Sequence, residues 1–202
     1  MALSDEVNPD DGIEALRSAT SFLHARLDSI IRHQVITADG ALDSINYRRY
    51  LQAQLKAHQR LETLITRFRA ELEQAGLTIT PRLHRTAWLR EDLGPAVHTV
   101  PAPGPVPRIS SVEGVLGVVY TVEGSSLGAR HLLAVARRCH ERQDQRLPTR
   151  FLEGYGEATG AMWRENLHCI AGRAREPARL KRLIAGARRA FAVFLQELPW
   201  QH

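Results

Sequence analysis

Three shortages in the sequence each exclude a class of protein. The two cysteines, Cys139 and Cys169, stand far apart without a CxxC motif, which argues against a disulfide framework and a cysteine zinc site. No run of about 18 apolar residues is present to cross a membrane. The N-terminus, MALSDEVNPDDG, lacks the positive start and the apolar centre of a secretory signal peptide. We therefore expect reduced thiols, no membrane partner and a cytoplasmic location.

Lysine is scarce as well, since Lys56 and Lys181 are the only lysines among 27 cationic residues and the rest are arginine. Against 22 carboxylates, this gives a formal net charge of +5. Arginine pairs with carboxylates and phosphates through two parallel hydrogen bonds. A basic chain suits a nucleic acid, an acidic protein or an anionic ligand, although a solvated basic surface explains the same charge. The cations are dispersed and no recognition motif is present, so we expect no nucleic-acid partner.

At about 150 residues per domain, a chain of 202 residues predicts one compact domain. Apolar residues recur at helical spacing almost throughout, and no segment alternates apolar and polar residues as a strand would. We therefore predict an all-α fold, a single-domain helical bundle over residues 11–200 preceded by a flexible acidic tail over residues 1–10. The predicted helices, about six in number, cover residues 11–34, 43–76, 81–93, 110–142, 148–170 and 177–198.

Local signals set the ends of these helices. Asp11 and Glu14 form a start that resembles a capping box, and Pro177 occupies a first helical position. Residues 94–107 contain five prolines, which remove hydrogen-bond donors. We predict an extended surface connection there and not a helix.

One face of the first predicted helix carries Arg17, Thr20, His24 and Leu27 at alternating spacings of three and four residues. A single histidine on such a face is most often a packed core residue. The alternative is a metal ligand, because neutral imidazole binds metals and Arg17 supplies a cation two turns earlier. The residues alone leave both interpretations open.

The helix predicted over residues 110–142 has four interior glycines, Gly114, Gly117, Gly124 and Gly128. Each costs about 1 kcal/mol relative to alanine, so a compensating gain is expected. Three of them, at positions 117, 124 and 128, share one face with Thr121. Such a face permits either close packing of another helix or a flat ligand lying against the backbone.

The segment GYGEATGAMWRENLH (residues 154–168) places Arg164 beside Trp163 in an apolar helix. This arginine either extends to solvent or pairs with a ligand carboxylate. Glu165 and His168 form one Glu-x-x-His motif, whereas a di-iron site in a helical bundle needs two such motifs and two further glutamates. No other histidine has a glutamate three residues before it, so we expect no di-iron site.

Three segments, LRSATSFLHARLD (residues 16–28), RTAWLREDL (residues 85–93) and GVVYTVEGSSLG (residues 117–128), together resemble one known family. The first is similar to the opening helix of the heme oxygenases, and the second is similar to their short third helix. The third resembles the distal helix of the bacterial branch found beside bacteriophytochromes. The Trp163–Arg164 pair and a final helix with Phe191, Phe194 and Leu198 also fit. The resemblance spans nearly the whole chain except the acidic tail and the proline-rich connection.

The resemblance implies a role for each matching residue. His24 would be the axial ligand of the iron in heme b, while Gly124, Ser125 and Gly128 of the distal helix would lie at the reaction centre above the porphyrin. Arg17 and Arg164 match positions where the family places basic residues near the heme propionates. The other residues expected around the heme are Thr20, Leu27, Tyr120, Thr121 and Ser126.

One departure from the pattern affects the distal side. Ser125 stands where animal-type members of the family have an aspartate. The resemblance therefore does not identify the group that orders water beside the heme.

The activity implied by the resemblance is oxidative cleavage of heme by O2 to biliverdin, carbon monoxide and ferrous iron, with heme as both substrate and prosthetic group. No flavin or nicotinamide motif is present, so electrons would come from an external donor, a ferredoxin or a reductase. A bacteriophytochrome that accepts biliverdin follows from the resemblance alone. Two alternatives stay open: a heme carrier on the same scaffold that does not turn over, and a protein that binds another small molecule.

Overall fold

The computed structural model describes residues 9–143 and 147–200, and these residues form helices without any β-sheet, which confirms the predicted all-α class. The α-helices are α1 (Pro9–Val35), α2 (Ser44–Arg67), α3 (Arg69–Gln74), α4 (Arg85–Leu93), α5 (Val112–Gln143), α6 (Arg150–Glu153), α7 (Thr159–Ala174) and α8 (Pro177–Glu197). Short 3-10 helices are η1 (Thr80–Leu83), η2 (Gly94–Thr99) and η3 (Gly156–Ala158). Of the tail expected over residues 1–10, residues 1–8 lie outside the described part of the chain.

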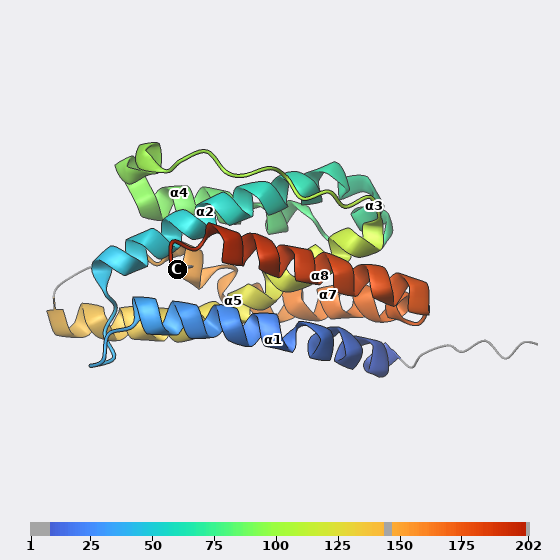
Figure 1. Ribbon diagram of the computed structural model, residues 1–202, viewed down its shortest axis with the longest axis horizontal. Coiled ribbons are helices and arrows are strands. Elements are labelled where there is room, and N and C mark those ends of the chain that lie inside the picture. Colours follow the sequence, from blue (N-terminus) through green and yellow to red (C-terminus); the bar gives the residue numbers. More distant parts are fainter. Residues whose placement is uncertain (1–8, 144–146, 201–202) are drawn as a thin grey trace, which may run out of the picture.

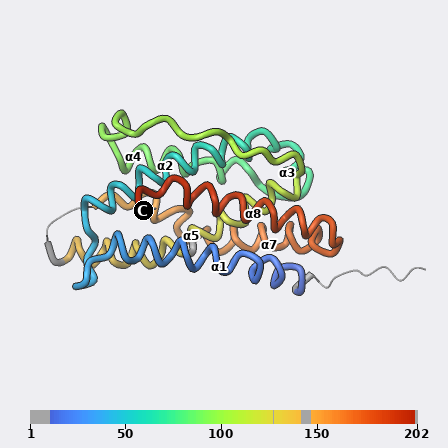
Figure 2. The backbone as a smooth tube through the Cα atoms, viewed as in Figure 1, coloured from blue at the N-terminus to red at the C-terminus, as the bar shows by residue number. Residues whose placement is uncertain are grey.

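Helix α5 runs through the middle of the bundle and packs most extensively against α8 (Figure 1). Helices α1 and α7 pack on α8 as well, while α2 and α4 pair with each other on the opposite side of the molecule. Figure 2 shows the backbones of α1 and α5 running along the same side of the bundle. These two backbones nevertheless approach each other at almost no point. Both helices pack against α7 and α8 instead.

The crossing of α5 and α8 depends on glycine. A Cβ atom added to Gly117 would overlap the carbonyl oxygen of Leu183, and one added to Gly186 would overlap the carbonyl oxygen of Gly114. The two backbones are therefore closer than any larger residue permits. The first half of the glycine face predicted on α5 thus serves helix packing.

Most predicted helix ends are confirmed. The side chain of Asp43 caps α2 by accepting hydrogen bonds from the N–H groups of Ile45 and Asn46, and Pro177 begins α8. Helix α1 begins earlier than predicted, at Pro9, so Asp11 lies inside it and does not cap it. Glu14 pairs instead with Arg17, at 2.9 Å between Oε2 and Nη1.

Three predicted segments are interrupted or differently folded. The helix expected over residues 148–170 is broken into α6, η3 and α7, because Gly154 and Gly156 adopt positive φ angles of 55° and 57°. The helix expected over residues 81–93 is η1 followed by α4, and the one over residues 43–76 is split at Phe68. The connection predicted as extended begins with the 3-10 helix η2, in which Pro95 occupies an early helical position.

The buried apolar side chains form two clusters along the bundle. One cluster surrounds the α5–α8 crossing and includes Leu116, Leu183 and Phe194. The other joins α2, α4, α6 and the C-terminal half of α5, and includes Leu51 and Leu132. Helix α5 belongs to both, so the stretch of α5 between them is where the core is discontinuous.

Candidate functional site

A cavity of about 640 Å³ lies between α1 and α5 and is closed at the back by α2 and α8. Its walls are mostly apolar, and they draw Phe191 and Phe194 from one core cluster and Leu132 from the other. This volume lies within the range of small-molecule sites in proteins. The cavity is lined by every residue predicted for the site except Arg164 and Ser126, namely Arg17, Thr20, His24, Leu27, Tyr120, Thr121, Gly124, Ser125 and Gly128.

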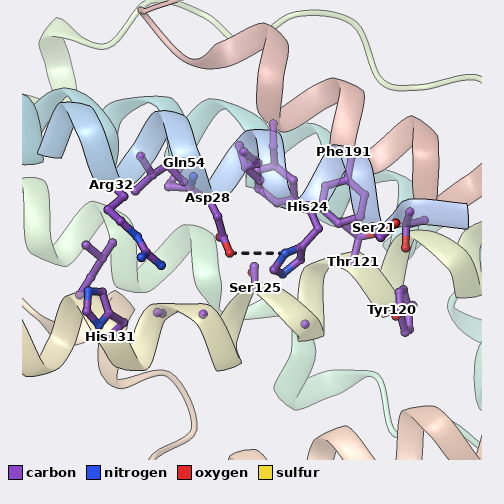
Figure 3. Close-up of a pocket in the computed structure, with 18 of the residues that line it drawn as sticks. Ser21, His24, Asp28, Arg32, Gln54, Tyr120, Thr121, Ser125, His131 and Phe191 are labelled. Atoms are coloured by element: carbon purple, nitrogen blue, oxygen red, sulfur yellow. Dashed lines mark ion pairs between the residues drawn. The ribbon is translucent and has the colours of Figure 1, made fainter. Parts of the chain in front are cut away.

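The wall supplied by α1 carries His24. Its side chain is 54% exposed, so the imidazole is not packed into the core. Figure 3 shows His24 and Asp28 projecting from α1 toward α5, with Ser125 across from the imidazole. The imidazole Nδ1 lies 3.4 Å from Oδ2 of Asp28, and the ring contacts the edge of Phe191 at 6.0 Å between centroids. Both contacts restrict the orientation of the ring within the cavity.

Thr20 and Leu27 flank His24 on the same face of α1, and both are buried. The Thr20 hydroxyl donates to the carbonyl oxygen of Leu16 at 2.9 Å, so it is satisfied within α1. Leu27 is a member of the first core cluster. These two residues fix the α1 face against the core while His24, between them, is left facing the cavity.

The wall supplied by α5 has almost no side chains over one turn. A Cβ atom added to Gly128 would meet nothing within 4 Å, and one added to Gly124 would meet only Trp163, at 3.9 Å. No neighbouring helix therefore requires glycine at these two positions, unlike Gly117. The Ser125 hydroxyl donates to the carbonyl oxygen of Val122 at 2.7 Å, and Thr121 donates to Ala187 of α8 at 3.3 Å. The second half of the glycine face lines open space.

One end of the cavity is aromatic. The rings of Tyr120 and Trp163 lie 5.4 Å apart, and Arg17 stands at this end on α1. Burial raises the pKa of the Tyr120 phenol, and the charge of Arg17 and a hydrogen bond with Thr20 only partly oppose that rise. Tyr120 is therefore a neutral hydrogen-bonding group at neutral pH.

Sequence reasoning missed the opposite end and the back of the cavity. Arg32 and His131 lie near each other at that end in Figure 3, on α1 and α5. Tyr50 and Gln54 of α2 line the back, and burial together with the charge of Asp28 raises the pKa of the Tyr50 phenol. Arg32 follows Asp28 by four residues, so the two share one face of α1. Gln54 follows Tyr50 by four residues, so these two share one face of α2. That signal alone did not show which face of α2 meets the cavity.

Arg164 does not line the cavity but is exposed on α7, although Trp163 beside it does. Glu165 points to a third side, where Oε2 accepts a hydrogen bond from Arg82 at 2.7 Å and Oε1 accepts one from the N–H of Thr78. The predicted contact of Arg164 with a ligand carboxylate stays a prediction. Ser126 also lies outside the cavity and accepts a hydrogen bond from Arg85 at 2.9 Å.

Other expectations concern groups outside the cavity. Cys139 and Cys169 are buried and free. Within the described part of the chain, no three histidine, cysteine or acidic side chains gather to hold a metal ion, as a di-iron site would require. Among the helices over 9–143 and 147–200, none is both long and apolar enough to span a bilayer.

Comparisons with known proteins agree with this fold. Residues 11–198 match the heme oxygenase family. The crystal structure of the NO- and CO-bound heme oxygenase from Neisseria meningitidis is similar, with 23% sequence identity and a TM-score of 0.65 over 93% of this chain and 89% of that chain. At this identity, the structural likeness supports the fold alone. No curated protein matches the chain. The family match, which covers nearly the whole sequence, establishes that this chain belongs to the heme oxygenase family.

Proposed function

We propose that this chain binds heme b between α1 and α5 and cleaves it, with O2 and external electrons, to biliverdin, carbon monoxide and ferrous iron. The observation that supports this best is a pair of facing walls. An imidazole enters the cavity from α1, and the opposite wall on α5 has glycine at two positions where packing does not demand it. A flat macrocycle with a metal at its centre fits walls of this kind, with His24 as the axial ligand.

Asp28 supports the proposed role of His24. A carboxylate beside Nδ1 favours the tautomer with its proton on that nitrogen. The lone pair of Nε2 is then available to a metal, and the imidazole stays neutral while it binds. Asp28 would also hold the ring plane in place.

Bound heme would supply both the iron that activates O2 and the carbon that is oxidised, so the residues of this chain need only position and enclose it. Gly124 and Gly128 leave room for the ring and a small molecule beside it. Ser125 and Thr121 already donate to carbonyl oxygens, so their own oxygens are free to accept a hydrogen bond. Protons would reach this side through water, since Gly124, Ser125 and Gly128 supply neither a carboxylate nor an imidazole. Arg17 and Arg164 are the proposed partners of the propionates.

The decisive experiment mixes the purified protein with hemin and a reductant in air. Absorption bands of biliverdin should replace the Soret band, and carbon monoxide should be released in equal amount. A matched reaction under carbon monoxide should stop before ring opening. If the Soret band persists in air while reductant is consumed, the enzyme assignment fails and the carrier remains.

A heme carrier on the same scaffold is the second candidate, because it requires the same cavity and the same His24. It predicts tight, reversible hemin binding without turnover. A protein for another small molecule predicts no Soret shift at all.

We further propose an acidic ferredoxin or reductase as the electron donor, because the formal net charge is +5. Reduction of the hemin complex by such a donor should slow several-fold between about 50 and 500 mM salt, because salt screens surface charge. A rate that is indifferent to ionic strength contradicts this docking. A bacteriophytochrome as acceptor of biliverdin and membership of the bacterial branch found beside such proteins are proposed from the sequence resemblance. A cytoplasmic location is proposed from the sequence composition.

A further inference from the structure

A buried ionic network lies behind the glycine-lined wall of the cavity. Oε1 of Glu123, one residue before Gly124, forms ion pairs with two arginines and accepts a hydrogen bond from one tyrosine. Arg82 approaches Oε1 at 3.1 Å, Arg85 at 3.2 Å and the Tyr155 hydroxyl at 3.0 Å. The side chains of Arg82, Arg85 and Glu123 are each no more than 2% exposed. Removing one partner from charges buried to this degree is strongly destabilising, so these ion pairs tie η1 and α4 to α5.

Arg85 extends the network into the cavity wall. Its Nη2 donates to the Ser126 hydroxyl at 2.9 Å, and its Nη1 donates to the Tyr155 hydroxyl, also at 2.9 Å. Ser126 lies in the turn of α5 between Gly124 and Gly128. The Arg85 guanidinium group of α4 therefore contacts α5 at two nearby residues, through an ion pair with Glu123 and a hydrogen bond to Ser126.

Toward the cavity, this turn of α5 presents Gly124, Ser125 and Gly128, none of which has a large side chain. A Cβ atom added to Gly128 would meet nothing within 4 Å, and one added to Gly124 would meet only Trp163. Glycine also lowers the helical preference of this turn, by about 1 kcal/mol at each position. At Gly128, therefore, no packed neighbour on the cavity side restrains the backbone. On the buried side, Arg85 holds the turn through its hydrogen bond to Ser126.

We propose that Arg85 is a positioning residue, which fixes the backbone of residues 124–128 through its hydrogen bond to Ser126 and so sets the position of the cavity wall opposite His24. The effect on a bound heme rests on the proposed function, but the anchoring of α5 does not. Arg85 touches no cavity ligand itself, since it does not line the cavity.

The first test uses the ligand-free protein and measures amide hydrogen exchange in peptides covering residues 123–129. Ser126→Ala removes the hydroxyl and leaves the paired charges of Arg85 and Glu123 intact. Exchange in this turn should accelerate about fivefold, because a hydrogen bond to a charged group is lost from a locally opening segment. Ser125→Ala is the matched control, because that hydroxyl donates only within α5. Its exchange should stay within about twofold of the wild type.

A second variant links the effect to Arg85. In an Arg85→Lys background, Ser126→Ala should add no further acceleration, because lysine cannot reach Ser126 and Tyr155 together. If Arg85→Lys does not fold, the comparison of the two serine variants decides alone. The proposal that Arg85 anchors this turn is overturned if Ser126→Ala exchanges at the wild-type rate. It is also overturned if both serine variants show the same acceleration.

The second test adds hemin and records the electron paramagnetic resonance spectrum of the ferric complex. Ser126→Ala should change the ratio of high-spin to low-spin signals, because a displaced turn alters the space beside the iron. Thr63→Ala, which removes a hydroxyl bonded within α2, should match the wild type. A wild-type spectrum in Ser126→Ala despite faster exchange overturns the positioning of heme. If no variant and no wild-type protein binds hemin, the proposed function fails while the exchange result still decides the anchoring.

Discussion

At the scale of single residues, the direction of each side chain decides whether a residue predicted for the site lines the cavity. Trp163, Arg164 and Glu165 are consecutive on α7, where each residue is rotated by about 100° from the last. Trp163 enters the cavity, Arg164 faces solvent and Glu165 binds Arg82. The sequence indicates a motif here, but it does not tell which of three neighbouring directions points inward. On α1 the apolar stripe settled that question, so the positions of Arg17, Thr20, His24 and Leu27 were predictable.

The role of His24 gives the first prediction at this scale. His24→Ala should remove the Soret band of the wild-type hemin complex and weaken hemin binding at least about tenfold, because the axial ligand is lost. Added imidazole should restore much of the spectrum by occupying the vacated space. His33→Ala is the control, since His33 bonds to Ser29 on the exposed side of α1. A wild-type spectrum in His24→Ala would identify another histidine as the ligand.

At the scale of elements, α5 uses glycine in two different ways along one helix. Gly117 lets α8 cross at short distance, whereas Gly124 and Gly128 leave a wall of the cavity bare. The sequence indicates that each glycine must bring a gain that offsets its low helical preference. Close helix packing and an open ligand-binding wall both explain such a gain at every position. Deciding between them requires knowing where α8 leaves α5, which is a property of the tertiary structure.

This division predicts opposite effects of the same substitution. Gly117→Ala should lower the free energy of unfolding by at least about 2 kcal/mol, because the added methyl overlaps the backbone of α8. Gly128→Ala should leave that free energy unchanged or raise it by up to about 1 kcal/mol, because the methyl meets open space inside a helix. Urea unfolding of the ligand-free protein measures both. Equal losses in the two variants would contradict the assignment.

The breaks in predicted helices also belong to this scale. Apolar periodicity continues through residues 148–170, so a single helix was predicted. Positive φ angles at Gly154 and Gly156 interrupt it. Glycine permits such angles without requiring them, so the sequence pattern alone did not locate the break.

At the scale of the whole molecule, the fold class and the order of helices were predictable because apolar spacing persists along the entire chain. The sequence predicts residues 94–107 as a surface connection, and Arg60 of α2 holds the later part of it by donating to the carbonyl oxygen of Pro105 at 2.9 Å. The same arginine pairs with Glu197 at the end of α8, at 2.7 Å. Lys56 also reaches Glu197, at 2.9 Å. These long-range pairs join three distant parts of the chain and leave no local pattern in the sequence.

Glu197 gives the whole molecule a pH-dependent stability. Burial opposes the charge of its carboxylate, but hydrogen bonds and ion pairs with Lys56 and Arg60 outweigh burial and lower its pKa. A carboxyl group with a lowered pKa in the folded state stabilises the protein above its ordinary pKa, and that stability is lost as pH falls through the folded value. The free energy of unfolding should therefore fall on acidification from about pH 5 to pH 3. The loss should be smaller in Glu197→Gln, which starts about 1–2 kcal/mol less stable at neutral pH.

The control for this prediction is Glu157→Gln, because Glu157 is exposed on η3 and lies away from Lys56 and Arg60. Its acid dependence should follow that of the wild type. Parallel acid profiles in all three proteins would show that Glu197 does not carry the effect.

The gap between α1 and α5 also bears on how long the folded protein lasts. A rigid disc seated there would bridge the two apolar clusters, so the melting temperature should climb with the logarithm of free pigment concentration. Opening the ring would convert the rigid macrocycle into a flexible open chain. The two clusters would then no longer be joined through the ligand. Under the proposed chemistry, each catalytic cycle would thus return the protein to its less stable, ligand-free form. That form could either bind a new ligand or be degraded.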